Sequence, residues 1–133
     1  MGSSSSKMTA CNYHYVREFT KNRSGILICT LSNGSCYIPG TTEIEKEEAV
    51  INGILKKRAQ TQNFIIIYGS NHMDDTVISK YRQLRNMGFR NVYCYLGGMF
   101  EWLLLQTVFG LTEFPTIGDG EILDYNPVRT LEV

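Results

Sequence analysis

The stretch NFIIIYGSNHMDDTV, residues 63–77, joins an apolar run to a polar loop and then to the start of a helical pattern. Residues 64–68 are all apolar or aromatic, which is typical of a strand buried on both faces. The loop that follows contains no cysteine and consists of Gly69, Ser70, Asn71, His72, Met73, Asp74 and Asp75. Ligands of open α/β folds bind where strands end and helices begin, so this loop is the first candidate for a functional site.

The same alternation continues on both sides of this stretch. Apolar runs of strand length occur at residues 25–31 and 91–96. Helical spacing of apolar residues is seen at residues 41–60, 76–88 and 97–110, and more weakly at 15–22. Strands that alternate with helices predict a single-domain α/β fold with a mostly parallel central sheet and helices on both faces.

The ends of these elements carry recognisable signals. Thr41 or Thr42 is expected to cap the helix of residues 41–60, and Gly88 is expected to end the helix of residues 76–88. Residues 32–35 are expected to form a turn, followed by a short extended piece at residues 36–40.

The chain of 133 residues has the size of one ordinary domain. We expect a flexible N-terminal segment at residues 1–12, the folded domain at 13–117 and a C-terminal extension at 118–133. No internal repeat or linker divides the chain.

Composition narrows the class of partner. The formal net charge is zero, so nothing indicates a nucleic-acid-binding protein. No apolar run reaches the roughly 18 residues of a membrane helix. We therefore expect a cytoplasmic protein with no cofactor and no nucleic-acid partner.

The four cysteines are Cys11, Cys29, Cys36 and Cys94. No two of them form a C-x-x-C pair, so a zinc site is not expected. Free thiols in a reducing compartment fit this chain better than a disulfide scaffold does.

The first residues, MGSSSSK, allow two interpretations. They fit the N-myristoylation pattern with Gly2 as the acceptor, and they also fit an artificial or low-complexity leader. A single acyl chain gives only weak membrane association, although Cys11 is placed where a palmitoyl chain could be added.

The segment MGFRNVYCYLGGMFEW, residues 87–102, is the most specific motif of the chain. Together with ILICTL, YIPGT and IIIYG, it resembles the rhodanese-like domain family from about residue 25 to residue 105. The phrase GGMFEWLLLQ…FPT is similar to rhodanese-like proteins of large DNA viruses. The resemblance implies a rhodanese-like fold and sulfur transfer through a cysteine persulfide formed on the loop after the residue 64–68 strand.

The chain departs from the family pattern where the chemistry should occur. Gly69 stands at the position of the family's nucleophilic cysteine, and Asn71 is a second candidate for that position. Neither residue can act as a nucleophile. Cys29 and Leu31 replace the Asp and Arg that the family places on its first strand.

The charge of the loop also disfavours the family's substrates. Thiosulfate and phosphate are anions, and a carboxylate about 4 Å away repels an anion by roughly 4 kcal/mol at an effective dielectric near 20. Asp74, Asp75 and Thr76 have an ordinary structural explanation as well, because Asp and Thr cap helix starts. We favour capping over a functional carboxylate pair or a metal site.

Two hypotheses follow. The first is a catalytically silent rhodanese-like domain that binds a protein partner through residues 69–75 and an exposed side of the apolar helix at 99–109. Silent family members act in protein–protein recognition, which is what the resemblance implies here. The second is a divergent sulfurtransferase with a non-standard nucleophile, namely Cys94, Cys36 or Ser70. Such a nucleophile would have to lie in a cradle of backbone N–H groups at a helix start.

Overall fold

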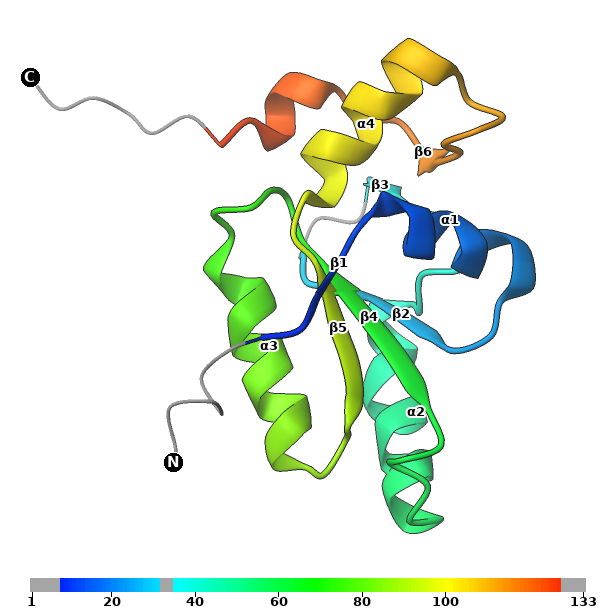
Figure 1. Cartoon of the computed structure of the whole chain (residues 1–133), viewed down its shortest axis with the longest axis vertical. Helices are drawn as coiled ribbons and strands as arrows, with labels where there is room; N and C mark the ends of the chain where they lie inside the picture. Colours follow the sequence, from blue (N-terminus) through cyan, green and yellow to red (C-terminus); the bar gives the residue numbers. More distant parts are fainter. Residues whose placement is uncertain (1–7, 32–34, 128–133) are drawn as a thin grey trace, which may run out of the picture.

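The computed structural model describes residues 8–31 and 35–127. Its central sheet has four strands, which are β1 (Ala10–Cys11), β2 (Ile26–Cys29), β4 (Phe64–Tyr68) and β5 (Asn91–Tyr95). They lie in the order β1-β5-β4-β2, and every pair is parallel (Figure 1). The predicted parallel sheet is thereby confirmed.

The central strand β4 shows why this sequence forms a two-sided core. Ile66 and Tyr68 point into one hydrophobic cluster, whereas Ile65 and Ile67 point into another. Side chains alternate between the two faces of a strand, so a continuous apolar run is stable only when both faces are covered. All four of these side chains are at most 1% exposed.

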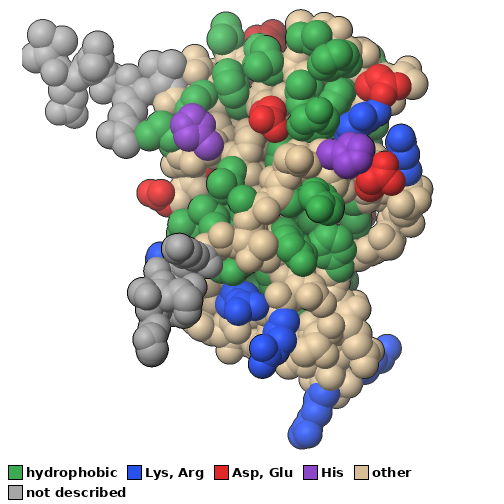
Figure 2. Space-filling view, in the orientation of Figure 1, with side chains coloured by type: hydrophobic (Ala, Val, Ile, Leu, Met, Phe, Trp, Pro, Cys, Tyr) green, Lys and Arg blue, Asp and Glu red, His purple; other side chains and the backbone are tan. Residues whose placement is uncertain are grey.

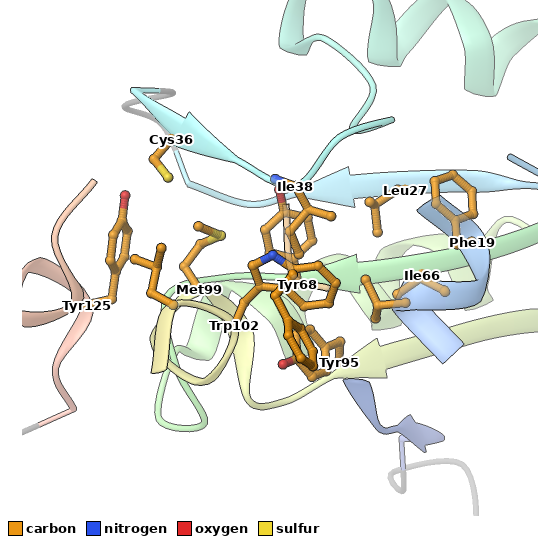
Figure 3. Close-up of a cluster of buried hydrophobic side chains, with 13 residues drawn as sticks. Phe19, Leu27, Cys36, Ile38, Ile66, Tyr68, Tyr95, Met99, Trp102 and Tyr125 are labelled. Atoms are coloured by element: carbon orange, nitrogen blue, oxygen red, sulfur yellow. Dashed lines mark hydrogen bonds between the residues drawn. The ribbon is translucent and has the colours of Figure 1, made fainter. Parts of the chain in front are cut away.

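Helices cover both faces, as predicted. The helices α1 (Tyr13–Asn22) and α4 (Gly98–Phe109) supply residues of the cluster that contains Tyr68. The helices α2 (Ile44–Lys56) and α3 (Asp75–Asn86) supply residues of the cluster that contains Ile65. Figure 3 shows the first cluster, in which Trp102 of α4 lies near Tyr95 of the sheet. The Trp102 ring also contacts the Phe114 ring.

The predicted cap of the second helix is wrong. That helix begins at Ile44 after Glu43, and no side chain caps it. The Thr41 hydroxyl instead donates a hydrogen bond to the carbonyl of Ile38 at 2.6 Å and lies 2.8 Å from the Tyr68 hydroxyl. This helix also ends at Lys56, four residues before its predicted end.

Three short elements were not predicted from the sequence, namely β1, β6 (Ile117–Gly118) and η2 (Ile122–Tyr125). β1 pairs with β5 and so orders Ala10 and Cys11, which we had placed in a flexible segment. β3 (Cys36–Tyr37) lies in the extended piece predicted at residues 36–40 and pairs with β6 in a small antiparallel sheet, and η2 is a 3-10 helix that packs beside α4. These elements have two to four residues, too few for hydrophobic periodicity, and each is ordered by contact with a part of the chain distant in sequence.

Residues 1–7, 32–34 and 128–133 lie outside the described part of the chain. The lipidation candidate Gly2 and most of the predicted 32–35 turn fall there. Among the residues that are described, no helix is long and apolar enough to cross a membrane.

Candidate functional site

The loop between β4 and α3 begins in the core and ends at the surface. Gly69 directly follows Tyr68 and is buried, and α3 begins at Asp75. The backbone of the loop is fixed by the start of α4, since the N–H groups of Met99 and Phe100 donate to the carbonyls of Gly69 and Ser70 at 3.0 and 2.9 Å. The loop therefore lies where two helices begin, as the sequence predicted for a functional site.

Gly98 makes this approach of α4 to the loop possible. Its φ is +61°, and a Cβ there would lie 2.6 Å from the Gly69 carbonyl oxygen and 3.0 Å from the Asn71 nitrogen. Only glycine combines this backbone conformation with so close a contact to another backbone.

The space beside Gly69 is already filled. A Cβ at this position would overlap Oδ2 of Asp74 and would lie 2.8 Å from both Thr30 Oγ1 and Val77 Cγ2. The Asp74 carboxylate thus occupies the volume into which a side chain of residue 69 would project. A nucleophile could not be accommodated at Gly69 without moving this carboxylate.

Asp74 is held in that position by four hydrogen bonds. Its Oδ2 accepts from the Ser70 N–H at 2.9 Å and from the Ser70 hydroxyl at 3.0 Å. Its Oδ1 accepts from the N–H and the hydroxyl of Thr76 at 3.0 and 2.5 Å. The capping role predicted for Asp74 is confirmed, and the bonds to Ser70 extend it across the loop.

The electrostatics of Asp74 follow from the same contacts. Burial by itself would raise the pKa of Asp74, but the hydrogen bonds from Thr76 and Ser70 outweigh burial and lower the pKa below its ordinary value. The carboxylate is therefore ionised at neutral pH. It binds the same donors that an external oxyanion would need, and its charge repels such an anion.

The remaining loop residues divide into two groups. Asn71 is tied down, because its side-chain N–H donates to the Tyr125 carbonyl at 2.8 Å and its side-chain oxygen accepts from the Met73 N–H at 2.9 Å. The side chains of His72, Met73 and Asp75 are exposed. Of the seven predicted loop residues, these three face solvent and can contact a partner.

Two of the alternative nucleophiles are buried thiols. Cys94 lies inside β5 with no exposed surface, and burial raises its pKa to about 12. Cys36 is 2% exposed, and burial raises its pKa as well. Figure 3 places Cys36 beside Met99 and Tyr125, within the core cluster.

Ser70 is the third alternative nucleophile, and it does lie at the helix start. Its hydroxyl donates to Asp74, so a base is in contact with it. That base is weak, since the pKa of Asp74 is lowered. An ionised carboxylate beside Ser70 also opposes attack on an anionic substrate.

Cys29 was not among the alternative nucleophiles named from the sequence, yet it is more accessible than Cys36 and Cys94. It is half-buried and lines a cavity of about 270 Å³, together with Leu31, Tyr37, Thr41, Thr42, Glu43, Ile44 and Glu45. Burial raises the pKa of Cys29, and hydrogen bonds with the Leu31 backbone and the Tyr68 side chain lower it only in part. The thiol is therefore protonated at neutral pH, which makes it a poor nucleophile.

No group of three His, Cys, Asp or Glu side chains suited to a metal ion occurs in the described ranges 8–31 and 35–127. The four cysteines all lie in these ranges and are free thiols.

Comparison with known proteins agrees with this architecture. A solution NMR structure of the rhodanese-like domain from the Alr3790 protein of Anabaena sp. is similar over 96% of this chain and 90% of its own, with a TM-score of 0.59 and 17% identity. A crystal structure of the same Anabaena protein covers 81% of this chain and 91% of its own at a TM-score of 0.58 and 18% identity. The BH2092 protein of Bacillus halodurans is similar over 74% of this chain and 73% of its own, with a TM-score of 0.54 and 18% identity.

Identities this low show a shared fold and nothing about activity. No curated protein matches the chain. A model of the rhodanese-like domain family, however, matches residues 13–105, which is more than half of the sequence. The chain belongs to the rhodanese-like domain family.

Proposed function

We propose that this chain is a catalytically silent rhodanese-like domain that works by binding a protein partner. The observation that carries the proposal is the Asp74 carboxylate beside Gly69. It fills the volume of the missing side chain and takes the loop's hydrogen-bond donors. With glycine at the nucleophile position, the loop lacks the thiolate that sulfur transfer requires. With a carboxylate bound to its donors, the loop also lacks the positive potential that would attract an anionic substrate.

Surface composition supports the binding role. The residues of the 69–75 loop that face solvent lie at the start of α3, and α4 carries large apolar side chains that are exposed. Exposed apolar side chains that gather on one element are typical of interaction surfaces. The proposed location is the cytoplasm, with weak membrane association in the case that Gly2 is acylated.

The test of silence is a thiosulfate:cyanide sulfurtransferase assay with an active rhodanese as the positive control. We expect turnover at background. Turnover above background that disappears when any one cysteine is changed to serine would overturn the proposal.

A divergent sulfurtransferase is the second candidate, and one observation favours it. Cys29 lines a cavity at the carboxyl end of β2, which is the edge of the sheet where α/β folds bind ligands. Its raised pKa and the carboxylates of Glu43 and Glu45 on the cavity wall place this candidate second. The Cys29→Ser variant in the same assay distinguishes the two candidates.

A further inference from the structure

The apolar character of α4 does not match its position in the fold. Eight of its twelve residues have apolar side chains, and these are distributed all round the helix. A helix that is apolar all round is normally covered on all sides. Among the residues that the structure describes, only one side of α4 is covered, by the cluster that contains Trp102 and Leu103.

The uncovered side forms a surface that we call the α4 face, defined by Leu104, Val108, Phe109 and Leu111. Their exposed fractions are 45%, 65%, 60% and 64%. Leu104 and Val108 are four residues apart and so lie on the same side of the helix. Figure 2 shows hydrophobic side chains gathered at the end of the molecule where α4 lies. The exposed Leu123 of η2, which packs beside α4, adds to the apolar surface at this end.

The charged residues of the segment that contains the α4 face are all acidic. Residues 96–127 contain five acidic residues and no Lys, Arg or His, the acidic residues being Glu101, Glu113, Asp119, Glu121 and Asp124. Two of the five are engaged, because Glu101 accepts a hydrogen bond from Tyr95 and Glu113 pairs with Arg17. Asp119, Glu121 and Asp124 are exposed and form no ion pair with any residue of the described ranges.

Most of the exposed positive charges in the described ranges lie away from this segment, although Arg17, Lys21 and Arg23 lie on or directly after α1, which packs in the same cluster as α4. Exposed Lys and Arg side chains occur at the carboxyl ends of α2 and α3 and before β5, namely Lys56, Lys57, Arg58, Arg82, Arg85 and Arg90. Figure 2 shows Lys and Arg side chains at the end of the molecule opposite α4. A net charge of zero therefore conceals an uneven distribution, with an acidic, apolar segment at residues 96–127 and a group of Lys and Arg at the opposite end of the molecule.

We propose that the α4 face binds a basic, amphipathic helical segment of a partner protein. The apolar stripe of such a segment covers Leu104, Val108 and Phe109, and its Lys or Arg side chains meet Asp119, Glu121 and Asp124. This inference rests on the proposed binding function and names the class of partner.

A second copy of this chain fits the face less well. The end that carries Lys56–Arg58, Arg82, Arg85 and Arg90 could complement the acidic residues, but it offers little apolar surface. In the described ranges, none of the exposed large apolar side chains lies between residues 51 and 72 or between 74 and 103. Head-to-tail association would therefore bury the apolar side chains of α4 against a charged surface, which costs desolvation without apolar contact. An anionic membrane is also disfavoured, because the acidic side chains would face the lipid head groups.

The probe is a fluorescently labelled synthetic peptide of about five helical turns, with leucines on one side and lysines on the other. Two control peptides accompany it, one of the same composition in scrambled order and one with glutamate in place of lysine. Fluorescence anisotropy with the full chain should show binding of the leucine–lysine peptide that weakens as salt is raised. Both control peptides should bind at least about tenfold more weakly.

Matched protein variants locate the binding to the α4 face. Val108→Ser should weaken binding of the leucine–lysine peptide about tenfold, which is the scale of a central interface residue. Tyr15→Ser removes a similarly exposed side chain from α1 and should leave binding unchanged. Glu121→Lys with Asp124→Lys should weaken the lysine peptide and strengthen the glutamate peptide, whereas Glu48→Lys on α2, across the sheet, should do neither.

Several outcomes would overturn the inference. One is equal binding of all three peptides, and another is binding that Val108→Ser leaves unchanged. A concentration-dependent dimer that Val108→Ser abolishes would assign the face to a second copy, and vesicle binding lost in the same variant would assign it to a membrane. Failure of the peptide experiment while sulfurtransferase activity stays at background would refute this inference alone, because silence is measured separately.

Discussion

Gly69→Ala is the smallest change that probes the filled loop. The added methyl group would overlap Asp74 Oδ2 and press on Thr30 and Val77. Overpacking costs about 1–3 kcal/mol, and hydrogen bonds to a charged group, such as those Ser70 makes to Asp74, are worth about 1.5–3 kcal/mol each. Asp74 is half-buried, so water can replace part of the hydrogen bonding that its displaced carboxylate loses. We therefore expect Gly69→Ala to lower the free energy of unfolding by about 3 kcal/mol.

A double-mutant cycle with Asp74→Ser isolates the contact. Serine can still cap α3 but is too short to reach Ser70, so Asp74→Ser alone should cost about 1–2 kcal/mol. It also vacates the space beside residue 69. The double variant should therefore lose at least about 1 kcal/mol less than the sum of the two single variants.

Urea unfolding followed by far-UV circular dichroism measures these differences, provided that the denaturant slope is unchanged. Gly53→Ala is the matched control, because a Cβ at this helical position meets nothing within 4 Å. It should raise stability by roughly 0.5–1 kcal/mol. Single-variant costs that add within about 0.5 kcal/mol would refute the claim that Asp74 fills the space of residue 69.

Four further predictions follow from the same structure. The lowered pKa of Asp74 means that its contribution is present above its ordinary pKa of 3.8 and is lost as pH falls through the lower folded value, so wild type should lose more stability than Asp74→Ser between about pH 5 and pH 2. Cys94 should resist alkylation by iodoacetamide until the protein unfolds, and labelling as fast as that of a free thiol would contradict its burial. Gly98→Ala should lower the urea midpoint by more than Gly53→Ala raises it, since its Cβ would meet backbone atoms. Cell fractionation should give different membrane fractions for wild type and Gly2→Ala if Gly2 is acylated, and identical fractions would remove the lipid hypothesis.

Long elements of the fold could be predicted from the sequence, because each carries many repeats of its own signal. The apolar run at 64–68 predicted β4 with its bounds, and the helical spacing after it predicted α3. Short elements could not be predicted in this way. Ala10 and Cys11 form a strand because β5 offers an unpaired edge, and Tyr125 is ordered because α4 and the loop residue Asn71 hold it.

The candidate site shows the same division. Capping of α3 by Asp74 is a local rule and was predicted correctly. That Oδ2 of the same carboxylate lies beside Gly69 depends on the path of the whole loop and on Thr30, which directly follows the neighbouring strand β2. Cys29 was overlooked because its access to a cavity arises from the approach of residues 41–45 to the end of β2.

If the proposed function holds, no residue of this chain accepts sulfane sulfur from thiosulfate. Intact-protein mass spectrometry after incubation with thiosulfate, under non-reducing conditions, tests it most directly, with an active rhodanese as the control. We expect an unchanged mass for this chain and the gain of one sulfur atom for the control. A gain of one sulfur atom on this chain that is absent from its Cys29→Ser variant would show that the domain is not silent.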